Sequence, residues 1–232
     1  MKKLTITVNG ILRNLEYQFE AMYRKAFIKN DSLVGMDENF NAVEEELTDE
    51  DWEKIKKKEE DKITLPIDTF DLMNHFKFES KEEFEKFLYE DYNFQILAGA
   101  ESYPKAFDHL FKIQWFGELT KEFEITIVSN EKGKAIPSTY HFLAKKACRA
   151  KNVKFVEDYK SVWDFSDIVI TDLPEILDSK PEGKMTIKIN KLYNQWSNAD
   201  YVFDDLKELS DRETLDQMFP QKRVALHSEL NT

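Results

Sequence analysis

Short apolar runs alternate along much of the chain with segments whose apolar residues recur at helical spacing. The runs are rich in β-branched residues and almost free of Gly and Pro, which is typical of strands; they cover residues 4–9, 123–128, 153–156, 167–170, 186–189 and 201–203. Helical spacing follows at 15–28 and 104–119, and again after Pro137. Near-continuous apolar strands alternating with helices are typical of a parallel sheet with both faces covered. The pattern predicts an α/β fold, Rossmann-like, with helices on both faces.

Residues 30–100 interrupt this alternation with a mainly helical segment. Ser80 and Glu83 have the spacing of an N-terminal capping box, and Thr48 opens a similar one that predicts a helix to about Lys62. Asp68 or Thr69 is placed to cap a helix between these two. We therefore expect a core of residues 1–29 and 101–215, a helical insertion at 30–100 and a C-terminal tail at 216–232.

Polar residues follow several of the predicted strands. Thr7 and Asn9 follow the first, Ser129 and Asp172 end two later ones, and Lys160 lies one turn after another. In an open parallel sheet, the functional crevice lies beyond the carboxyl ends of the strands. We expect these five side chains to share that edge. Each also has an ordinary interpretation, as a strand end, a surface lysine or a turn residue.

The stretch Thr7-Val8-Asn9-Gly10, followed in order by Ser129, Lys160 and Asp172, resembles the motifs of the haloacid dehalogenase superfamily. Within that superfamily the resemblance is closest to the 5′-nucleotidase-like branch. That family carries Asp-x-Asp-Gly at the first strand, the first Asp being the nucleophile and the second the general acid/base. The resemblance implies that Ser129 contacts a phosphoryl group, that Lys160 neutralises charge and that Asp172 belongs to a Mg²⁺-binding pair. It makes the insertion at 30–100 a helical cap.

Both carboxylates of the first motif are absent from this chain. The Thr7 hydroxyl is a weak nucleophile without an adjacent base, and Asn9 cannot exchange a proton as an acid or base. Of the carboxylates expected around Mg²⁺ only Asp172 remains. We expect a degenerate site with no catalytic residue, no cofactor and no metal, Asp172 being a residual metal candidate.

The net charge, the cysteine count and the N-terminal apolar run disfavour several classes of partner and site. The 232 residues have a formal charge of −12, which disfavours nucleic acid phosphates. The single cysteine, Cys148, excludes an intramolecular disulfide and a Cys-based metal cluster. The apolar run after Met1 is too short for a signal peptide or a membrane span, so we expect a chain located inside a cell or in a virion.

These observations favour a structural or assembly role. We expect protein subunits as partners, in a homo- or hetero-oligomer, and no direct binding to nucleic acid or membrane. The aromatic-rich stretch 70–115 and the tail, with Phe219 and Leu226, are the expected contact surfaces. The composition also resembles that of virion (head-tail) proteins of crAss-like bacteriophages. The alternatives are an active Mg²⁺-dependent 5′-nucleotidase or phosphatase, and a sensor that binds a phosphate ligand without cleaving it.

Overall fold

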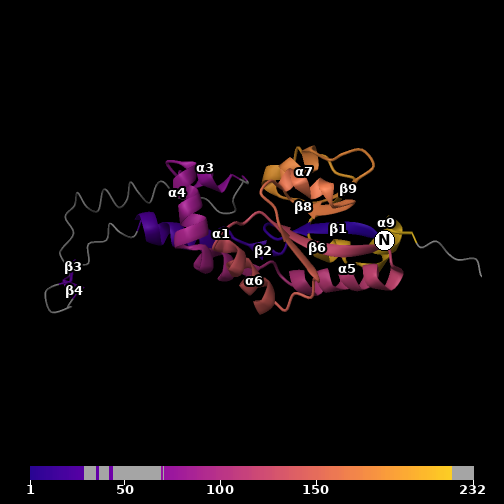
Figure 1. Ribbon diagram of the computed structural model, residues 1–232, viewed down its shortest axis with the longest axis horizontal. Helices are drawn as coiled ribbons and strands as arrows, with labels where there is room; N and C mark the ends of the chain where they lie inside the picture. The colour runs from indigo at the N-terminus through magenta and orange to yellow at the C-terminus, as the bar shows by residue number, and fades with distance from the viewer. Residues whose placement is uncertain (29–34, 37–41, 44–68, 70, 221–232) are drawn as a thin grey trace, which may run out of the picture. The chain divides into compact units, whose positions relative to one another are not determined.

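The computed structural model describes residues 1–28, 35–36, 42–43, 69 and 71–220 (Figure 1). Within these residues the chain divides into two compact units. The first comprises residues 1–13, 102–131 and 143–220, and the second comprises residues 14–101 and 132–142, each within the described part. The helix expected after Thr48 and the expected contact residue Leu226 lie outside the described residues.

A six-stranded sheet forms the centre of the first unit. Its order is β10-β9-β8-β1-β6-β7, and the registered pairs are parallel. The strands are β1 (Lys2–Thr7), β6 (Phe123–Ser129), β7 (Asn152–Phe155), β8 (Ile168–Thr171), β9 (Met185–Ile189) and β10 (Tyr201–Phe203). Figure 1 shows β8, β1 and β6 running side by side. The predicted Rossmann-like parallel sheet is therefore confirmed.

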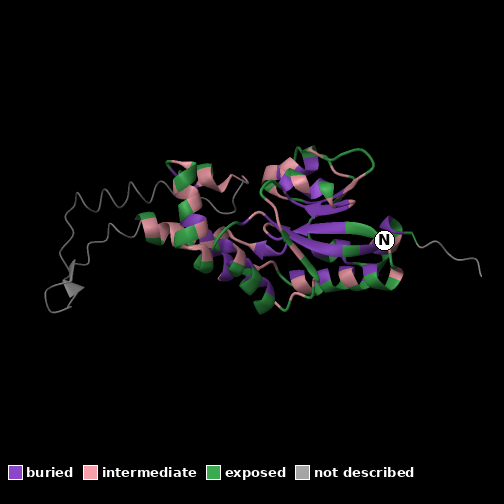
Figure 2. Cartoon of the chain, viewed as in Figure 1, coloured by how far each residue is buried: buried purple, intermediate pink, exposed green. Residues whose placement is uncertain are grey.

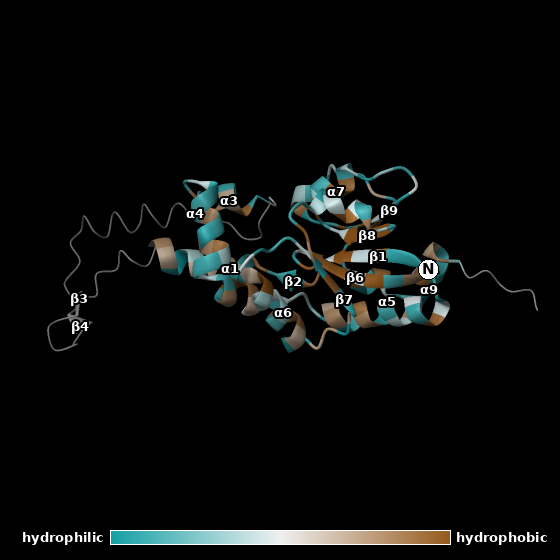
Figure 3. Ribbon diagram, in the orientation of Figure 1, coloured by the Kyte–Doolittle hydropathy of each residue, from teal (hydrophilic) through white to brown (hydrophobic). Residues whose placement is uncertain are grey.

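The core of this unit lies on the three central strands. Ile6, Ile127 and Ile170 are fully buried. Figure 2 shows the sheet strands largely in the purple of buried residues. Helices around the sheet keep water from it, which explains why these strands are apolar almost without alternation (Figure 3). The helices of this unit are α5 (Ala106–Thr120), α7 (Pro174–Asp178), α8 (Leu206–Leu209) and α9 (Arg212–Met218), with 3₁₀ turns η5 (Tyr159–Asp164) and η6 (Leu192–Asn194).

Phe219, directly after α9, does not lie on a contact surface as the sequence predicted. Phe219 was expected to face a partner, but it is buried, and its ring centroid lies 4.9 Å from that of Phe123 and 6.3 Å from that of Phe116. The expectation was wrong because an apolar residue near a chain end can close the core instead of extending from it. Phe219 packs against Phe123, the first residue of β6, and covers this end of the core.

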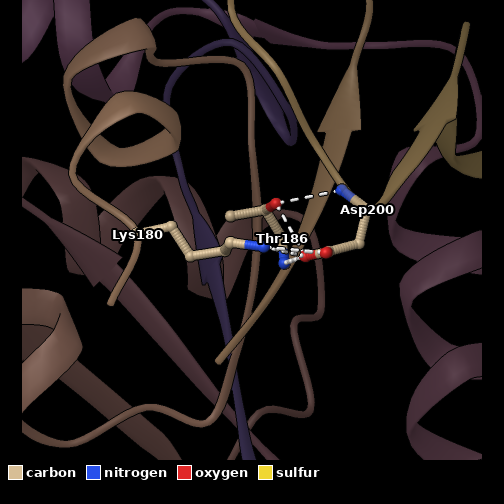
Figure 4. A network of polar contacts seen from close by, with 3 residues as sticks. All are labelled: Lys180, Thr186 and Asp200. Carbon is tan, nitrogen blue, oxygen red and sulfur yellow. Dashed lines mark hydrogen bonds and ion pairs between the residues drawn. The ribbon is translucent and has the colours of Figure 1, made fainter. Parts of the chain in front are cut away.

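A network of hydrogen bonds joins the first residues of the outer strand β9 to the residue that precedes β10. The Asp200 carboxylate accepts hydrogen bonds from the Thr186 backbone at 2.7 Å and from its hydroxyl at 3.1 Å, and the Lys180 ammonium group donates to it at 2.7 Å (Figure 4). The Asp200 amide in turn donates to the Thr186 hydroxyl oxygen. These bonds fix the entry into β10, which has only one strand neighbour.

The second unit is built around aromatic rings. Phe19 of α1 (Glu16–Tyr23) lies 4.6 Å from Phe76 and 5.3 Å from Phe87, measured between ring centroids. Its other helices are α3 (Leu72–His75) and α4 (Lys81–Lys86), with π-helical turns η1 (Arg24–Ile28), η3 (Phe87–Asp91) and η4 (Phe94–Ala98); α6 (Ala135–Lys145) begins in this unit. Short strands pair as β2 (Arg13–Asn14) with β5 (Glu101–Ser102) and β3 (Gly35–Met36) with β4 (Ala42–Val43).

The helix caps agree with the sequence at one position and differ at another. The Ser80 hydroxyl accepts from the Glu83 amide at 3.1 Å, and the Glu83 carboxylate accepts from the Glu79 amide, so α4 begins as predicted. At α3 the cap is Asp71, whose carboxylate accepts from the Asn74 amide. The predicted cap at Thr69 was wrong, because its hydroxyl accepts from the Asp71 amide, ahead of the helix. The other predicted cap, Asp68, lies outside the described residues. None of the described helices is both long and apolar enough to cross a membrane.

Candidate functional site

The polar residues that end β1, β6 and β8 lie on neighbouring strands. Thr7 ends β1, and its hydroxyl donates to the Thr171 hydroxyl oxygen at the end of β8, over 3.3 Å. That oxygen also accepts from the Leu173 amide at 3.1 Å. Both threonines are fully buried, so the Thr7 hydroxyl is engaged inside the sheet edge.

A buried ion pair occupies the end of β1 and β6. The Arg13 guanidinium group donates to the Glu131 carboxylate, and the two side chains are 0% and 1% exposed. Asn9 joins both partners: its amide donates to Glu131 at 2.9 Å, and its carbonyl oxygen accepts from Arg13 Nε at 2.8 Å. The Ser129 hydroxyl donates to the other Glu131 oxygen. Two of the five sequence candidates, Asn9 and Ser129, are therefore held in one network around Arg13 and Glu131.

The turn after β1 places Arg13 in this network. The Val8 carbonyl accepts from the Leu12 and Arg13 amides, both at 2.9 Å, and the Gly10 amide donates to the Arg13 carbonyl at 3.1 Å. Gly10 has a φ of +79°, which residues with a Cβ rarely adopt. The chain therefore folds back within a few residues and returns Arg13 beside Asn9.

Asp172 follows β8 and is buried. The Tyr193 hydroxyl donates to its Oδ2 atom, whereas its Oδ1 atom has no hydrogen-bond partner among the described residues. Burial raises the pKa of Asp172 from its ordinary 3.8 to about 6, although the Tyr193 hydrogen bond and the positive charge of Lys191 act to lower it. A Cβ added to Gly10 would lie 1.7 Å from Oδ2, so the turn after β1 packs directly on this carboxyl.

Buried polar groups hold the loop that carries Tyr193. The Asn194 side-chain amide donates to the carbonyls of Asp172 and Ile189, each at 2.9 Å. Lys188 of β9 is buried, and its ammonium group donates to the carbonyls of Asn194 and Ser197. These bonds anchor the loop that carries Tyr193 to β9 and to the Asp172 backbone.

Lys160 lies apart from these groups. It is exposed on η5, its amide is bound by the Asp158 carboxylate at 2.9 Å, and its positive charge acts on Glu175. Burial and the charge of Asp158 raise the pKa of Glu175, and Lys160 partly opposes them. No hydrogen bond or ion pair between described residues joins Lys160 to Thr7, Asn9 or Asp172. The positive charges that act on the Glu131 and Asp172 carboxyls come from Arg13 and Lys191 instead.

Sequence reasoning missed Arg13, Glu131, Lys191 and Tyr193. Two of them were within reach of the same argument, because Glu131 follows Ser129 by two residues and Arg13 follows Asn9 across a glycine turn. Tyr193 and Lys191 lie after β9, where no motif drew attention to them. Only the fold brings that loop to Asp172.

Comparisons with known proteins identify the fold. No family model matches the chain, and no curated protein matches it. Among solved structures, a haloacid dehalogenase-like hydrolase from Streptococcus pneumoniae is similar with a TM-score of 0.53 at 12% identity, over 90% of this chain and 96% of that one. The β-phosphoglucomutase of Clostridium difficile gives 0.52 at 15%, over 94% and 97%. A haloacid dehalogenase-like hydrolase from Burkholderia xenovorans gives 0.52 at 13%, over 93% and 99%.

This chain has the fold of the haloacid dehalogenase-like hydrolases. At these identities the likeness concerns the fold alone, and the chemistry must be argued from the residues present. The resemblance of the Thr7–Gly10 stretch implied a Mg²⁺ ion, for which the donor set is poor. One oxygen of Asp172 is bound by the Tyr193 hydroxyl, and the charge of Glu131 is neutralised by Arg13. No cluster of three metal-ligating residues occurs in the described part of the chain. The residues therefore do not fit a Mg²⁺ site.

Proposed function

We propose that this chain is a non-catalytic domain of haloacid dehalogenase-like fold that acts as a structural or assembly protein. One observation carries the proposal: the buried ion pair between Arg13 and Glu131 at the carboxyl ends of β1 and β6. A phosphoryl-transfer site keeps its positive charge and its hydroxyl donors available for the substrate. Here the guanidinium charge is neutralised within the protein.

The neighbouring groups support the same proposal. The Ser129 hydroxyl and the Asn9 amide both donate to Glu131, so neither is available to a phosphoryl oxygen without breaking a buried hydrogen bond. The Thr7 hydroxyl donates to Thr171, and a hydroxyl oxygen is too weak a base to activate it as a nucleophile. Asn9 and Ser129 are bound to Glu131, and Thr7 is bound to Thr171, so these three candidates take part in an arrangement that stabilises the strand ends.

An assembly role gives such a domain a use that needs no chemistry, because a fold can present surfaces for binding after its original site has changed. The partners in this proposal are protein subunits. A place in a bacteriophage particle, and descent from the 5′-nucleotidase-like branch, stay predictions from the composition and motifs.

The deciding experiment measures hydrolysis of p-nitrophenyl phosphate and a panel of nucleoside monophosphates with Mg²⁺. We expect the natural chain to release no phosphate above the rate of a Thr7→Val variant, which keeps the shape of that residue and lacks the hydroxyl. Turnover by the natural chain that is lost in both Thr7→Val and Asp172→Asn would contradict the proposal. It would make the chain a hydrolase with a threonine nucleophile.

The alternative of a working phosphatase is favoured by the hydrolases that share the fold. A Thr7→Asp, Asn9→Asp variant tests how much of that chemistry the fold still supports. The sensor alternative is tested by calorimetric titration of the natural chain with the same nucleotides. We expect no binding heat, because the hydrogen-bond donors beside Arg13 are already engaged.

A further inference from the structure

Helix α5 presents an apolar stripe to solvent. Phe111, Trp115 and Leu119 follow one another at a spacing of four residues, which places them on one face of the helix. They are 40%, 57% and 62% exposed, although each is a residue type that usually contributes to a core. A continuous stripe of large exposed apolar residues indicates a surface on which something else packs.

The stripe borders a groove between α5 and the α8–α9 segment. The groove has a volume of about 1200 Å³, and its lining includes Trp115 of α5 and Leu215 of α9. Helix α9 packs beside α5 (Figure 1), since the Arg212 guanidinium group lies 4.8 Å from the ring centroid of Phe116. The stripe and the groove together form one docking surface, which belongs entirely to the first unit.

The chain leaves α9 at the edge of this docking surface. Phe219 is buried with its ring centroid 6.3 Å from that of Phe116, and Pro220 after it is exposed. Residues 221–232, which lie outside the described residues, therefore continue from a point beside α5. The seven residues from Phe219 to Leu226 can span about 23 Å, whereas the stripe is about 12 Å long. The apolar residues of this segment can reach every part of the docking surface.

The composition of residues 221–232 suits that surface. The segment has apolar residues at Val224, Leu226 and Leu230, cations at Lys222 and Arg223, and an anion at Glu229. Four carboxylates and four cationic side chains line the groove, so it can pair with charges of both signs. The whole chain has a formal charge of −12 whereas this segment is net positive, so the body of the protein attracts it.

We propose that residues 221–232 pack on α5 and cover its apolar stripe, with Leu226 against Trp115. The covalent connection through Phe219 selects this occupant. A segment tethered so closely has an effective concentration on the order of millimolar, so a separate molecule must match that concentration or bind more tightly. The inference goes beyond the non-catalytic function proposed above, because it involves none of the residues at the strand ends.

The first test measures the exposure of Trp115 in the full chain. With 5-fluorotryptophan incorporated, the shift of each fluorine resonance between light and heavy water reports how far that ring contacts solvent. Leu226→Asp should weaken the docking about tenfold and increase this shift for Trp115, because a carboxylate replaces an apolar side chain in the contact. Asn231→Asp adds the same charge to the same segment without removing an apolar residue, and it should leave the shift unchanged.

The internal reference is Trp196, which is 94% exposed and lies outside the docking surface, so its shift should not respond to either substitution. An equal Trp115 shift in the natural chain and in Leu226→Asp overturns the inference. A Trp115 shift that depends on the protein concentration of the natural chain also overturns it, because the stripe is then covered by a second copy.

The reciprocal test measures how accessible the segment is to trypsin. Cleavage after Arg223 requires a segment that is free of packing, so its rate follows the undocked fraction. Trp115→Ala removes the centre of the stripe and should raise this rate about tenfold, measured as release of the peptide that begins at Val224. Trp196→Ala is the matched control and should leave the rate unchanged. Equal rates for the natural chain and Trp115→Ala overturn the inference.

The two proposals fail in different ways. An inactive chain whose Trp115 exposure ignores Leu226→Asp contradicts only the docking of residues 221–232. A chain that hydrolyses phosphate esters while the segment stays docked contradicts only the non-catalytic function.

Discussion

The buried Arg13–Glu131 pair gives the sharpest test of how the strand ends are stabilised. Replacing Arg13 with Met keeps most of the volume and removes the cation, leaving the Glu131 carboxylate buried with hydrogen bonds from Asn9 and Ser129 only. Breaking a buried ion pair from one side costs about 3–5 kcal/mol, because the remaining charge has lost its partner and cannot reach water. That is a large share of the roughly 5–15 kcal/mol by which a domain is stable.

Urea unfolding followed by circular dichroism measures this loss. With a slope of about 2 kcal/mol per molar urea, the midpoint should fall by about 1.5–2.5 M. Adding Glu131→Gln to Arg13→Met should recover part of the loss, since Gln still accepts from Ser129 and carries no charge. The double variant separates the cost of an unpaired charge from the cost of altered packing.

The partly exposed pair between Arg24 and Glu20 on α1 provides the control. Its N–O distance is 2.8 Å, and the arginine side chain is 40% exposed, so water still solvates the cation and Arg24→Met should cost no more than about 1 kcal/mol. An Arg13→Met variant that loses as little as Arg24→Met, or a double variant less stable than Arg13→Met alone, would refute the claim that an internal charge pair holds this site together.

Three further predictions concern the same sheet edge and the helical unit. The raised pKa of Asp172 means that the folded chain holds this proton more tightly than the unfolded chain, so ionisation destabilises the fold as pH rises from about 4 to about 6. The stability of Asp172→Asn relative to the natural chain should therefore rise by about 2–3 kcal/mol between pH 4 and pH 7, and parallel urea profiles would contradict the assignment. Gly10→Ala should lower the thermal midpoint far more than Gly133→Ala, because both have positive φ but only Gly10 would bring a Cβ against Asp172; equal shifts would disprove the close approach. Ser80→Ala should cost about 1 kcal/mol in urea unfolding through loss of the α4 cap, whereas no loss would show that the cap is dispensable.

Local pattern was enough to predict the strands of the first unit. The apolar runs at β1, β6 and β8 are continuous because both faces of the sheet are covered. Such a run of consecutive apolar residues can be recognised in the sequence without knowledge of the fold. The Ser80 cap was equally readable, since a capping box involves atoms only three residues apart. Phe219 was not readable, because whether an apolar residue near a chain end is buried depends on rings from α5 and β6, about a hundred residues away.

The sequence by itself determined which residues stand at the strand ends, since residue identity needs no coordinates, and the resemblance to the haloacid dehalogenase motifs predicts carboxylates where Thr7 and Asn9 stand. Only the tertiary structure decided what stands there instead. Arg13 meets Glu131 across 118 residues, and Tyr193 meets Asp172 across 21. The physical reason is that a sheet orders its strands by packing and hydrogen bonding instead of by their order along the chain. The partners of a charge at the sheet edge therefore come from whichever loops the fold brings beside it.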